Sequence, residues 1–147
     1  FKPVADYNGT ALAVYKISDG FTFSTNSDTL FILVTPVDDA PRIVGDGIPD
    51  STTQEDAADV SINLAEYFTD VDNDNAFITY TLDSLSASNI INATISSTTL
   101  KLDFLDDKNS LDGVDLRIKA TSNGKSITDV FKISIHLSKL IGDFSMN

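Results

Sequence analysis

A two-residue alternation of apolar and polar side chains, repeated along most of the chain, constrains its fold more than any other feature. Apolar residues alternate at Leu12 and Val14, again at Leu30, Ile32 and Val34, and in five further sets after residue 40. These later sets are Val60/Ile62/Leu64, Ile78/Tyr80/Leu82, Leu100/Leu102/Phe104, Leu116/Ile118/Ala120 and Phe131/Ile133/Ile135. Alternation of this period is typical of half-buried β-strands, and turn-forming residues bound each set. The pattern predicts an all-β Greek-key β-sandwich of the immunoglobulin type, with about seven strands after residue 40.

The acidic residues favour the same fold and narrow the function. Of the 22 carboxylate side chains, 20 are Asp, and the formal net charge is −12. Asp disfavours helices and favours turns, so we expect only one helical turn, at residues 64–68. Excess negative charge argues against nucleic acid and anionic membranes as partners. No apolar stretch is long enough to span a bilayer, so no membrane insertion is expected, and the absence of Cys excludes thiol chemistry.

An internal repeat predicts a tandem array of sandwiches. Residues 7–20 align without a gap on residues 111–124, which places Gly9 on Gly113 and Gly20 on Gly124. Leu30 then falls on Phe131 after a longer hairpin. We therefore expect residues 1–37 to be the last strands of one domain, residues 38–137 to be a complete domain, and residues 138–147 to be a tail. The alternative is that residues 1–37 add to the second domain as extra strands.

Carboxylates gather where the two predicted domains meet. Asp38 and Asp39 lie in the joint, between two prolines, and the loop after Phe68 contains Asp70, Asp72 and Asp74. Such a concentration of like charge calls for a counter-ion, and Ca²⁺ prefers carboxylate, amide and carbonyl oxygens. An EF-hand is excluded, because the loop has Asn75 where the turn needs Gly and Thr81 where a bidentate Glu is needed.

Three segments resemble known calcium-binding repeats. The spacing Asp70-x-Asp72-x-x-Asn75-Ala76-x-Ile78-x-Tyr80 is similar to a stretch of cadherin repeats. The stretch from Thr52-Thr53-Gln54-Glu55 to Phe68-Thr69-Asp70-Val71-Asp72 resembles the dystroglycan-type cadherin-like domains of bacterial surface proteins. The joint Val34-Thr35-Pro36-Val37-Asp38-Asp39-Ala40-Pro41 is similar to the end of the tandem repeats of large bacterial adhesins.

The resemblance implies Ca²⁺ held between consecutive domains. By position, Asp38 and Asp39 would be linker ligands, Glu55 would come from the domain base, and Asp70 and Asp72 would come from the loop. Asn75 would offer a backbone or amide oxygen, and Asp19 is a further candidate from the first unit.

No catalytic constellation is present, so we expect a non-enzyme. His136 stands out of phase with the apolar residues of its strand and should face solvent, without a nucleophile nearby. The leading hypothesis is an extracellular, calcium-stiffened spacer repeat of a large cell-surface or adhesin-like protein. Its partners would be neighbouring repeats of the same chain and a cell-surface glycan or protein ligand. The alternative is a calcium-dependent carbohydrate-binding or self-association module.

Overall fold

The computed structural model describes residues 1–137, and the predicted tail at residues 138–147 lies outside them. The chain divides into two compact units, the first formed by Phe1–Asp38 and the second beginning at Asp39. In the part of the chain that is described, no helix is long and apolar enough to cross a membrane.

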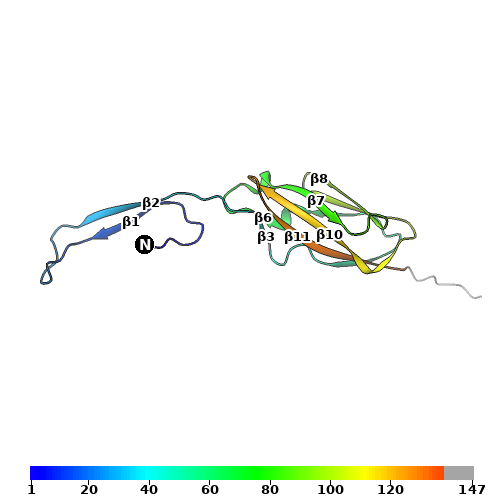
Figure 1. Cartoon of the computed structure of the whole chain (residues 1–147), viewed down its shortest axis with the longest axis horizontal. Helices are drawn as coiled ribbons and strands as arrows, with labels where there is room; N and C mark the ends of the chain where they lie inside the picture. The colour runs from blue at the N-terminus through cyan, green and yellow to red at the C-terminus, as the bar shows by residue number, and fades with distance from the viewer. Residues whose placement is uncertain (138–147) are drawn as a thin grey trace, which may run out of the picture. The chain divides into compact units, whose positions relative to one another are not determined.

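The first unit is a β-hairpin. Strand β1 (Gly9–Tyr15) pairs antiparallel with β2 (Asp28–Val34), and the two form a two-stranded sheet of their own (Figure 1). Gly9 lies opposite Val34, and Tyr15 lies opposite Asp28. Neither larger sheet of the described residues includes β1 or β2.

The second unit contains two main sheets. One has the order β4-β11-β10-β7 and the other the order β5-β9-β8, while β3 pairs with β6 as a short separate ladder. The strands are β3 (Arg42–Ile43), β4 (Ser51–Gln54), β5 (Val60–Asn63), β6 (Phe68–Thr69), β7 (Thr79–Leu85), β8 (Ile91–Ser96), β9 (Thr99–Phe104), β10 (Ser110–Ser122) and β11 (Lys125–His136). Two 3₁₀ turns, η1 (Leu64–Glu66) and η2 (Asn75–Phe77), interrupt them.

The long β10–β11 hairpin dominates the first of these sheets. Ser122 pairs with Lys125, so only Asn123 and Gly124 form the loop, and both have positive φ angles of 45° and 81°. An Asn-Gly pair suits this two-residue loop because both residues tolerate the left-handed backbone that matches strand twist. On its other edges the hairpin pairs antiparallel with β7 and parallel with β4.

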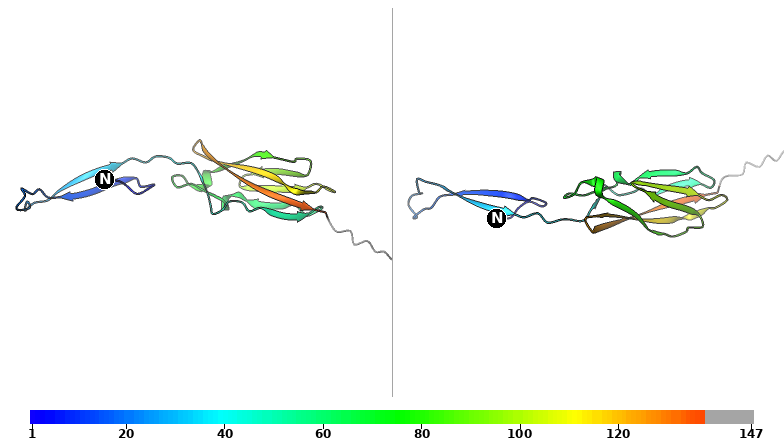
Figure 2. Two further views of the ribbon diagram at one scale, coloured as in Figure 1. Left: turned by 60° about the horizontal axis from the view of Figure 1, so that its bottom comes forward. Right: turned by 90° about the horizontal axis from the view of Figure 1, so that it is seen from above.

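The core lies between the two main sheets of the second unit, whose layers Figure 2 shows from two sides. The alternating apolar residues of β7, β10 and β11 meet those of β8 and β9. The residues with no exposed surface are Leu64, Ile91, Leu100, Val114, Leu116, Ile118, Ala120 and Ile135. The predicted β-sandwich is confirmed, and burial follows the alternation in the long strands.

Several details differ from the sequence prediction. Seven described strands after residue 40 have four or more residues, but the five predicted apolar sets include neither β4 nor β8. The helical turn at residues 64–68 is present as η1, whereas η2 was not expected. Val60 is exposed although it stands in an apolar set, because β5 is an edge strand. His136 faces solvent, as expected.

Candidate functional site

The candidate site is the acidic loop, residues 70–75, which lies between β6 and β7. Asp70 Oδ1 accepts hydrogen bonds from the backbone N–H groups of Asp72 and Asn73, both at 2.9 Å. The Asn73 side-chain amide donates to the same oxygen at 3.3 Å. A carboxylate that accepts from the backbone two and three residues later closes a local turn. Asp70 is therefore the residue around which the loop folds.

Asn75 fixes the other side of the loop. Its Oδ1 accepts a hydrogen bond from the Asp70 backbone N–H at 2.7 Å, and its Nδ2 donates to Thr69 Oγ1 at 3.1 Å. The Asn75 amide thus holds the chain at the start of the loop. Asp74 instead caps η2 by accepting from the Ala76 backbone N–H at 2.9 Å.

Asp70 is buried in an unusual way for a carboxylate. The residue is 9% exposed, and its Oδ2 is buried without a hydrogen-bond partner, as is the hydroxyl oxygen of Ser122. Burial raises the pKa of the Asp70 carboxyl. The Ser122 hydroxyl, the backbone N–H groups of Asp72 and Asn73 and the Asn73 amide together outweigh burial and hold the pKa below its usual range. The carboxylate is therefore charged at neutral pH, and the Ser122 hydroxyl lies close enough to Asp70 to lower its pKa although it makes no hydrogen bond of good geometry to Oδ2.

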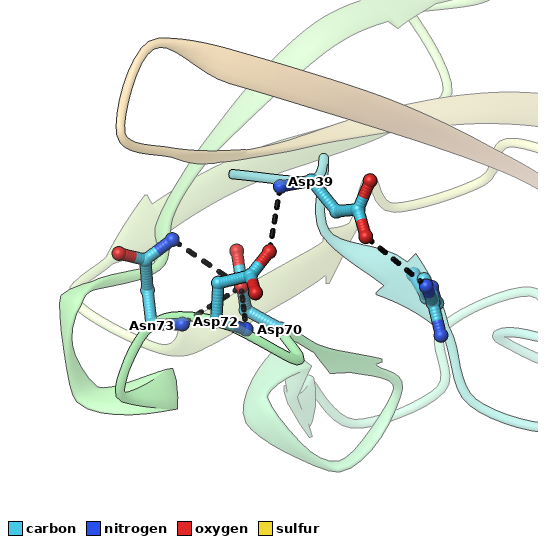
Figure 3. A network of polar contacts seen from close by, with 5 residues as sticks. Asp39, Asp70, Asp72 and Asn73 are labelled. Atoms are coloured by element: carbon cyan, nitrogen blue, oxygen red, sulfur yellow. Dashed lines mark hydrogen bonds and ion pairs between the residues drawn. The ribbon is translucent and has the colours of Figure 1, made fainter. Parts of the chain in front are cut away.

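Asp72 lies next to Asp70 and faces the beginning of the second unit. Its Oδ2 accepts a hydrogen bond from the backbone N–H of Asp39 at 2.6 Å, as Figure 3 shows. The Asp39 carboxylate turns away from this contact and pairs with Arg42 at 3.4 Å. Asp39 therefore meets the acidic loop through its backbone and meets Arg42 through its side chain.

The structure brings together only part of the predicted ligand set. Asp70, Asp72 and Asn75 share the acidic loop, and Asp39 touches it. Asp38 is the last residue of the first unit. Asn73, which is not among the predicted ligands, contributes a side-chain contact to Asp70. The sequence feature that could have predicted this contact is the position of Asn73, three residues after an Asp that closes a turn.

Glu55 lies at the other end of the second unit, so the prediction that it joins Asp70 and Asp72 is wrong. The Glu55 backbone N–H donates to the carbonyl of His136, at the end of β11, at 2.8 Å. Ser122, beside Asp70, instead pairs with Lys125 at the start of β11. The 12 residues of β11 separate these two ends by about 35 Å. Glu55 follows β4, which runs parallel to β11 and therefore ends at the same place as β11.

Asp19 also does not share a site with Asp38. Its Oδ1 accepts hydrogen bonds from the backbone N–H groups of Phe21 and Thr22, both at 2.9 Å. These bonds, with that from Thr22 the stronger, lower the pKa of the Asp19 carboxyl. Asp19 closes the loop that follows Tyr15, whereas Asp38 follows Val34, and the strand register places these at opposite ends of the hairpin.

The donor chemistry of the acidic loop fits Ca²⁺. Carboxylate, amide and backbone oxygens are hard ligands, and a charged carboxylate oxygen without a donor, such as Asp70 Oδ2, is suited to a cation. Within residues 1–137, no three His, Cys, Asp or Glu side chains are grouped closely enough to hold a metal ion. Asp70 and Asp72 would therefore supply the carboxylates, and backbone oxygens and water would complete the shell.

Comparisons with known proteins support the fold. No family model matches the sequence, and no curated protein matches it either. Domains EC1-2 of human protocadherin-24 superpose with a TM-score of 0.50 at 12% identity, over 88% of this chain and 67% of that one. An endo-fucoidan hydrolase from glycoside hydrolase family 107 superposes with a TM-score of 0.50 at 15% identity, over 93% of this chain. The present chain spans a fifth (20%) of the length of that hydrolase. At these identities the similarity establishes a cadherin-like β-sandwich fold.

Proposed function

We propose that this chain is a non-catalytic, extracellular, cadherin-like repeat that serves as a calcium-stiffened spacer in a cell-surface adhesion protein. The observation that carries the proposal is Asp70, a buried carboxylate whose Oδ2 has no donor and which lies beside Asp72. The cadherin-like fold supports the choice of adhesion, and the acidic composition supports the choice of cation.

Electrostatics gives the reason for a cation at this loop. Asp70 and Asp72 are adjacent carboxylates in a protein with a net charge of −12, and Asp70 is largely removed from water. Burying a charge is costly unless the charge is paired, so a bound Ca²⁺ would supply the missing partner. Sites of this kind in extracellular modules bind Ca²⁺ with dissociation constants of about 10⁻⁴ to 10⁻³ M.

The Asp39–Asp72 hydrogen bond suggests how binding would stiffen the chain. Asp72 Oδ2 already holds the backbone of Asp39, and Arg42 neutralises the Asp39 carboxylate. An ion bound at Asp70 and Asp72 would fix the orientation of the Asp72 carboxylate. The chain that enters the sandwich at Asp39 would then lose freedom at that point.

Thermal unfolding of the full chain in excess Ca²⁺ and in EDTA tests the site. We expect Ca²⁺ to raise the Tm of the second unit and the substitution Asp70→Asn to abolish the increase. Asp74→Asn is the matched control, because it removes the same charge from the same loop while keeping a side chain that can cap η2. Equal Ca²⁺ responses in Asp70→Asn and Asp74→Asn would contradict the proposed site.

A separate measurement tests the spacer role. Small-angle scattering of the full chain should give a narrower distribution of interatomic distances in Ca²⁺ than in EDTA. A Tm increase with an unchanged distribution would leave the ion bound but would refute stiffening.

One exposed aromatic residue favours the alternative, a carbohydrate-binding module. Phe21, in the loop between β1 and β2, is 96% exposed. Exposed rings can stack on sugars. Fucoidan is the glycan to test first, because the hydrolase named above acts on it. Binding that is lost in Phe21→Ala but kept in Phe77→Ala, an exposed phenylalanine of the second unit, would favour this alternative over a passive spacer.

A further inference from the structure

The β10–β11 hairpin is the one part of the second unit where positive charge gathers. It holds four of the ten basic residues of the chain and three of its 22 acidic residues, whereas the whole chain has a net charge of −12. Two of the basic residues, Arg117 and Lys119, stand two positions apart on β10. Leu116, Ile118 and Ala120, which alternate with them, are fully buried, so Arg117 and Lys119 lie on the outer face of the sheet.

These two cations are unpaired, unlike Lys132 on the neighbouring strand. Within residues 1–137, neither the Arg117 guanidinium nor the Lys119 ammonium makes a hydrogen bond or an ion pair. Lys132, by contrast, forms an ion pair with Asp115 at 3.7 Å and donates to the carbonyl of Asp112 at 3.2 Å. Residues that follow one another on one face of a strand are about 7 Å apart, so the two free charges reinforce each other.

Hydroxyl side chains flank the two cations on the neighbouring strands, β7 and β11, which lie on either side of β10 (Figure 1). Lys119 lies opposite Thr81 of β7 and opposite Thr128 of β11. Arg117 lies opposite Ser84 of β7. All three hydroxyl residues are exposed. Hydroxyl groups can donate hydrogen bonds to an anion beside those that Arg and Lys donate. We call these five residues the cationic face.

The composition of the cationic face distinguishes between classes of anionic partner. A protein interface has an apolar or aromatic centre, whereas the one large apolar residue opposite these two cations is Val130. A nucleic acid requires contacts to several phosphates, and single strands also require aromatic stacking, but the face offers two free cations and no aromatic ring. A sulfate ester on a sugar chain fits better. A guanidinium can donate two parallel hydrogen bonds to such an oxyanion, and Lys and hydroxyl groups can donate to its other oxygens.

The carboxylates of the chain limit how densely the partner can be charged. Asp83 precedes Ser84 on β7 and is exposed, and the net charge of the chain is −12. Charges act over about 8 Å at physiological ionic strength. A polyanion with closely spaced charges would meet repulsion around the cationic face. Isolated sulfate groups would meet mainly Arg117 and Lys119.

We propose that the cationic face binds a sparsely sulfated polysaccharide, with one sulfate group held by Arg117 and Lys119 and with Thr81 and Thr128 donating to its oxygens. The face is particular to the second unit, because the sequence repeat aligns Ala13 with Arg117 and Tyr15 with Lys119. It uses no residue of the acidic loop and does not depend on Ca²⁺ there. The chain would then contribute to adhesion by contacting a glycan directly.

An NMR titration of the full chain with chondroitin sulfate, in EDTA, tests the proposal. This polysaccharide carries isolated sulfate groups, and unsulfated chondroitin is the matched control because it keeps the same sugars and carboxylates. Chondroitin sulfate should shift the amides of Arg117, Lys119 and Thr128, and the binding should weaken as NaCl rises from about 0.05 to about 0.5 M. Chondroitin should cause no such shifts. Absence of binding, or equal binding of the two polymers, would overturn the proposal and would leave the calcium site unaffected, because EDTA removes Ca²⁺.

Substitutions on β10 test the assigned residues. Arg117→Gln and Lys119→Gln should each weaken binding by about fivefold. Arg117→Lys keeps the charge but loses the paired donors, so it should weaken binding by less than Arg117→Gln. Lys108→Gln, in the exposed loop between β9 and β10, removes the same charge elsewhere in the unit and should leave binding unchanged. Equal losses in Lys108→Gln and Arg117→Gln would overturn the site, and an unchanged Tm of Arg117→Gln verifies that this variant is folded.

One substitution should strengthen binding. Asp83→Asn removes the carboxylate beside the cationic face and should tighten binding of chondroitin sulfate by about twofold or more. Unchanged or weaker binding would contradict the placement of the sulfate next to Arg117. Sedimentation of the chain without polysaccharide tests the competing occupant. Self-association that is lost in Arg117→Gln would identify a second copy of the chain on this face and would overturn the proposal, whereas a monomer is the expected result.

Discussion

The backbone N–H of Asp39 donates a hydrogen bond to Oδ2 of Asp72 at 2.6 Å, which ties the start of the second unit to the acidic loop. The two residues are 33 positions apart in the chain. The contact fixes Asp72 beside Asp70, whose own carboxylate organises the loop from within. Hydrogen bonds from the backbone of Asp39 and from the loop's own backbone therefore hold the acidic loop in place.

The Asp39–Asp72 contact should contribute measurably to stability. Asp72→Ala removes the acceptor and should lower the free energy of unfolding of the second unit by about 1 kcal/mol in EDTA. Asp72→Asn keeps an acceptor oxygen and should lower the free energy of unfolding by less. Urea denaturation of both variants measures the difference, and equal losses would show that the hydrogen bond has no part in the effect.

Asp70 should give the second unit a dependence on acidic pH. Burial alone would raise the pKa of this carboxyl, but its hydrogen bonds lower the pKa from the ordinary value of 3.8. A carboxyl whose pKa is lower in the folded state stabilises the fold above its unfolded pKa, and this stabilisation is lost as pH falls through the folded pKa. Asp70→Asn should therefore reduce the loss of stability on acidification below about pH 4.

Carboxyl-carbon NMR titration of Asp70 in the absence of Ca²⁺ checks the direction of the shift directly. A midpoint above 3.8 would mean that burial, rather than hydrogen bonding, dominates at this residue.

Gly47 should be irreplaceable because of its contact with a buried carboxylate. Asp129 Oδ2 accepts a hydrogen bond from the Ile48 backbone N–H at 2.7 Å, and a Cβ on Gly47 would collide with the Asp129 carboxylate. Gly47→Ala combines this collision with a φ of +83°, so we expect a loss of about 2 kcal/mol or more.

Gly45→Ala is the control for Gly47→Ala, because Gly45 also has positive φ but has open space at its Cβ position. Thermal or urea unfolding should show the smaller loss for Gly45→Ala, of about 1 kcal/mol. Equal losses would attribute the Gly47 effect to backbone strain alone.

The repeat offers a matched pair of leucines for testing the difference between the units. Leu116→Ala removes a side chain with 0% exposure and should destabilise the second unit by about 2–5 kcal/mol. Leu12→Ala, at the corresponding position with 64% exposure, should change the stability of the full chain by less than about 0.5 kcal/mol. A large effect of Leu12→Ala on unfolding would mean that the β1–β2 hairpin is already covered.

The sequence predicted the sandwich because alternation reports burial directly. Leu116, Ile118, Phe131 and Ile133 are buried where their period placed them. Strand β4 gave no such signal, because Ser51–Gln54 is polar. Strand β8 does alternate, since Ile91, Ala93 and Ile95 are less exposed than the polar residues between them, but the set is short and contains only two large apolar residues. Strand pairing between distant segments supplies what the local pattern of β4 lacks.

The candidate site was predicted less completely than the fold. Asp70, Asp72 and Asn75 are close in sequence, so their spacing alone placed them in one loop. The position of Glu55 depends on the direction in which β4 runs beside β11. Apolar alternation does not encode this direction, because an alternating strand can pair either parallel or antiparallel. The burial of Asp70 Oδ2 beside Ser122 arises from residues 52 positions apart and was likewise beyond a local pattern.

Residue-resolved NMR during a Ca²⁺ titration of the full chain tests the central claim most directly. Saturable shifts should centre on the backbone amides of Asp70, Asp72 and Asn73, with a midpoint of about 10⁻⁴ to 10⁻³ M, and should disappear in Asp70→Asn. The amide of Asp39 should shift with them, because it donates to Asp72. An acidic loop whose amides do not respond to Ca²⁺ at 10 times the upper end of that range, about 10⁻² M, would contradict the claim.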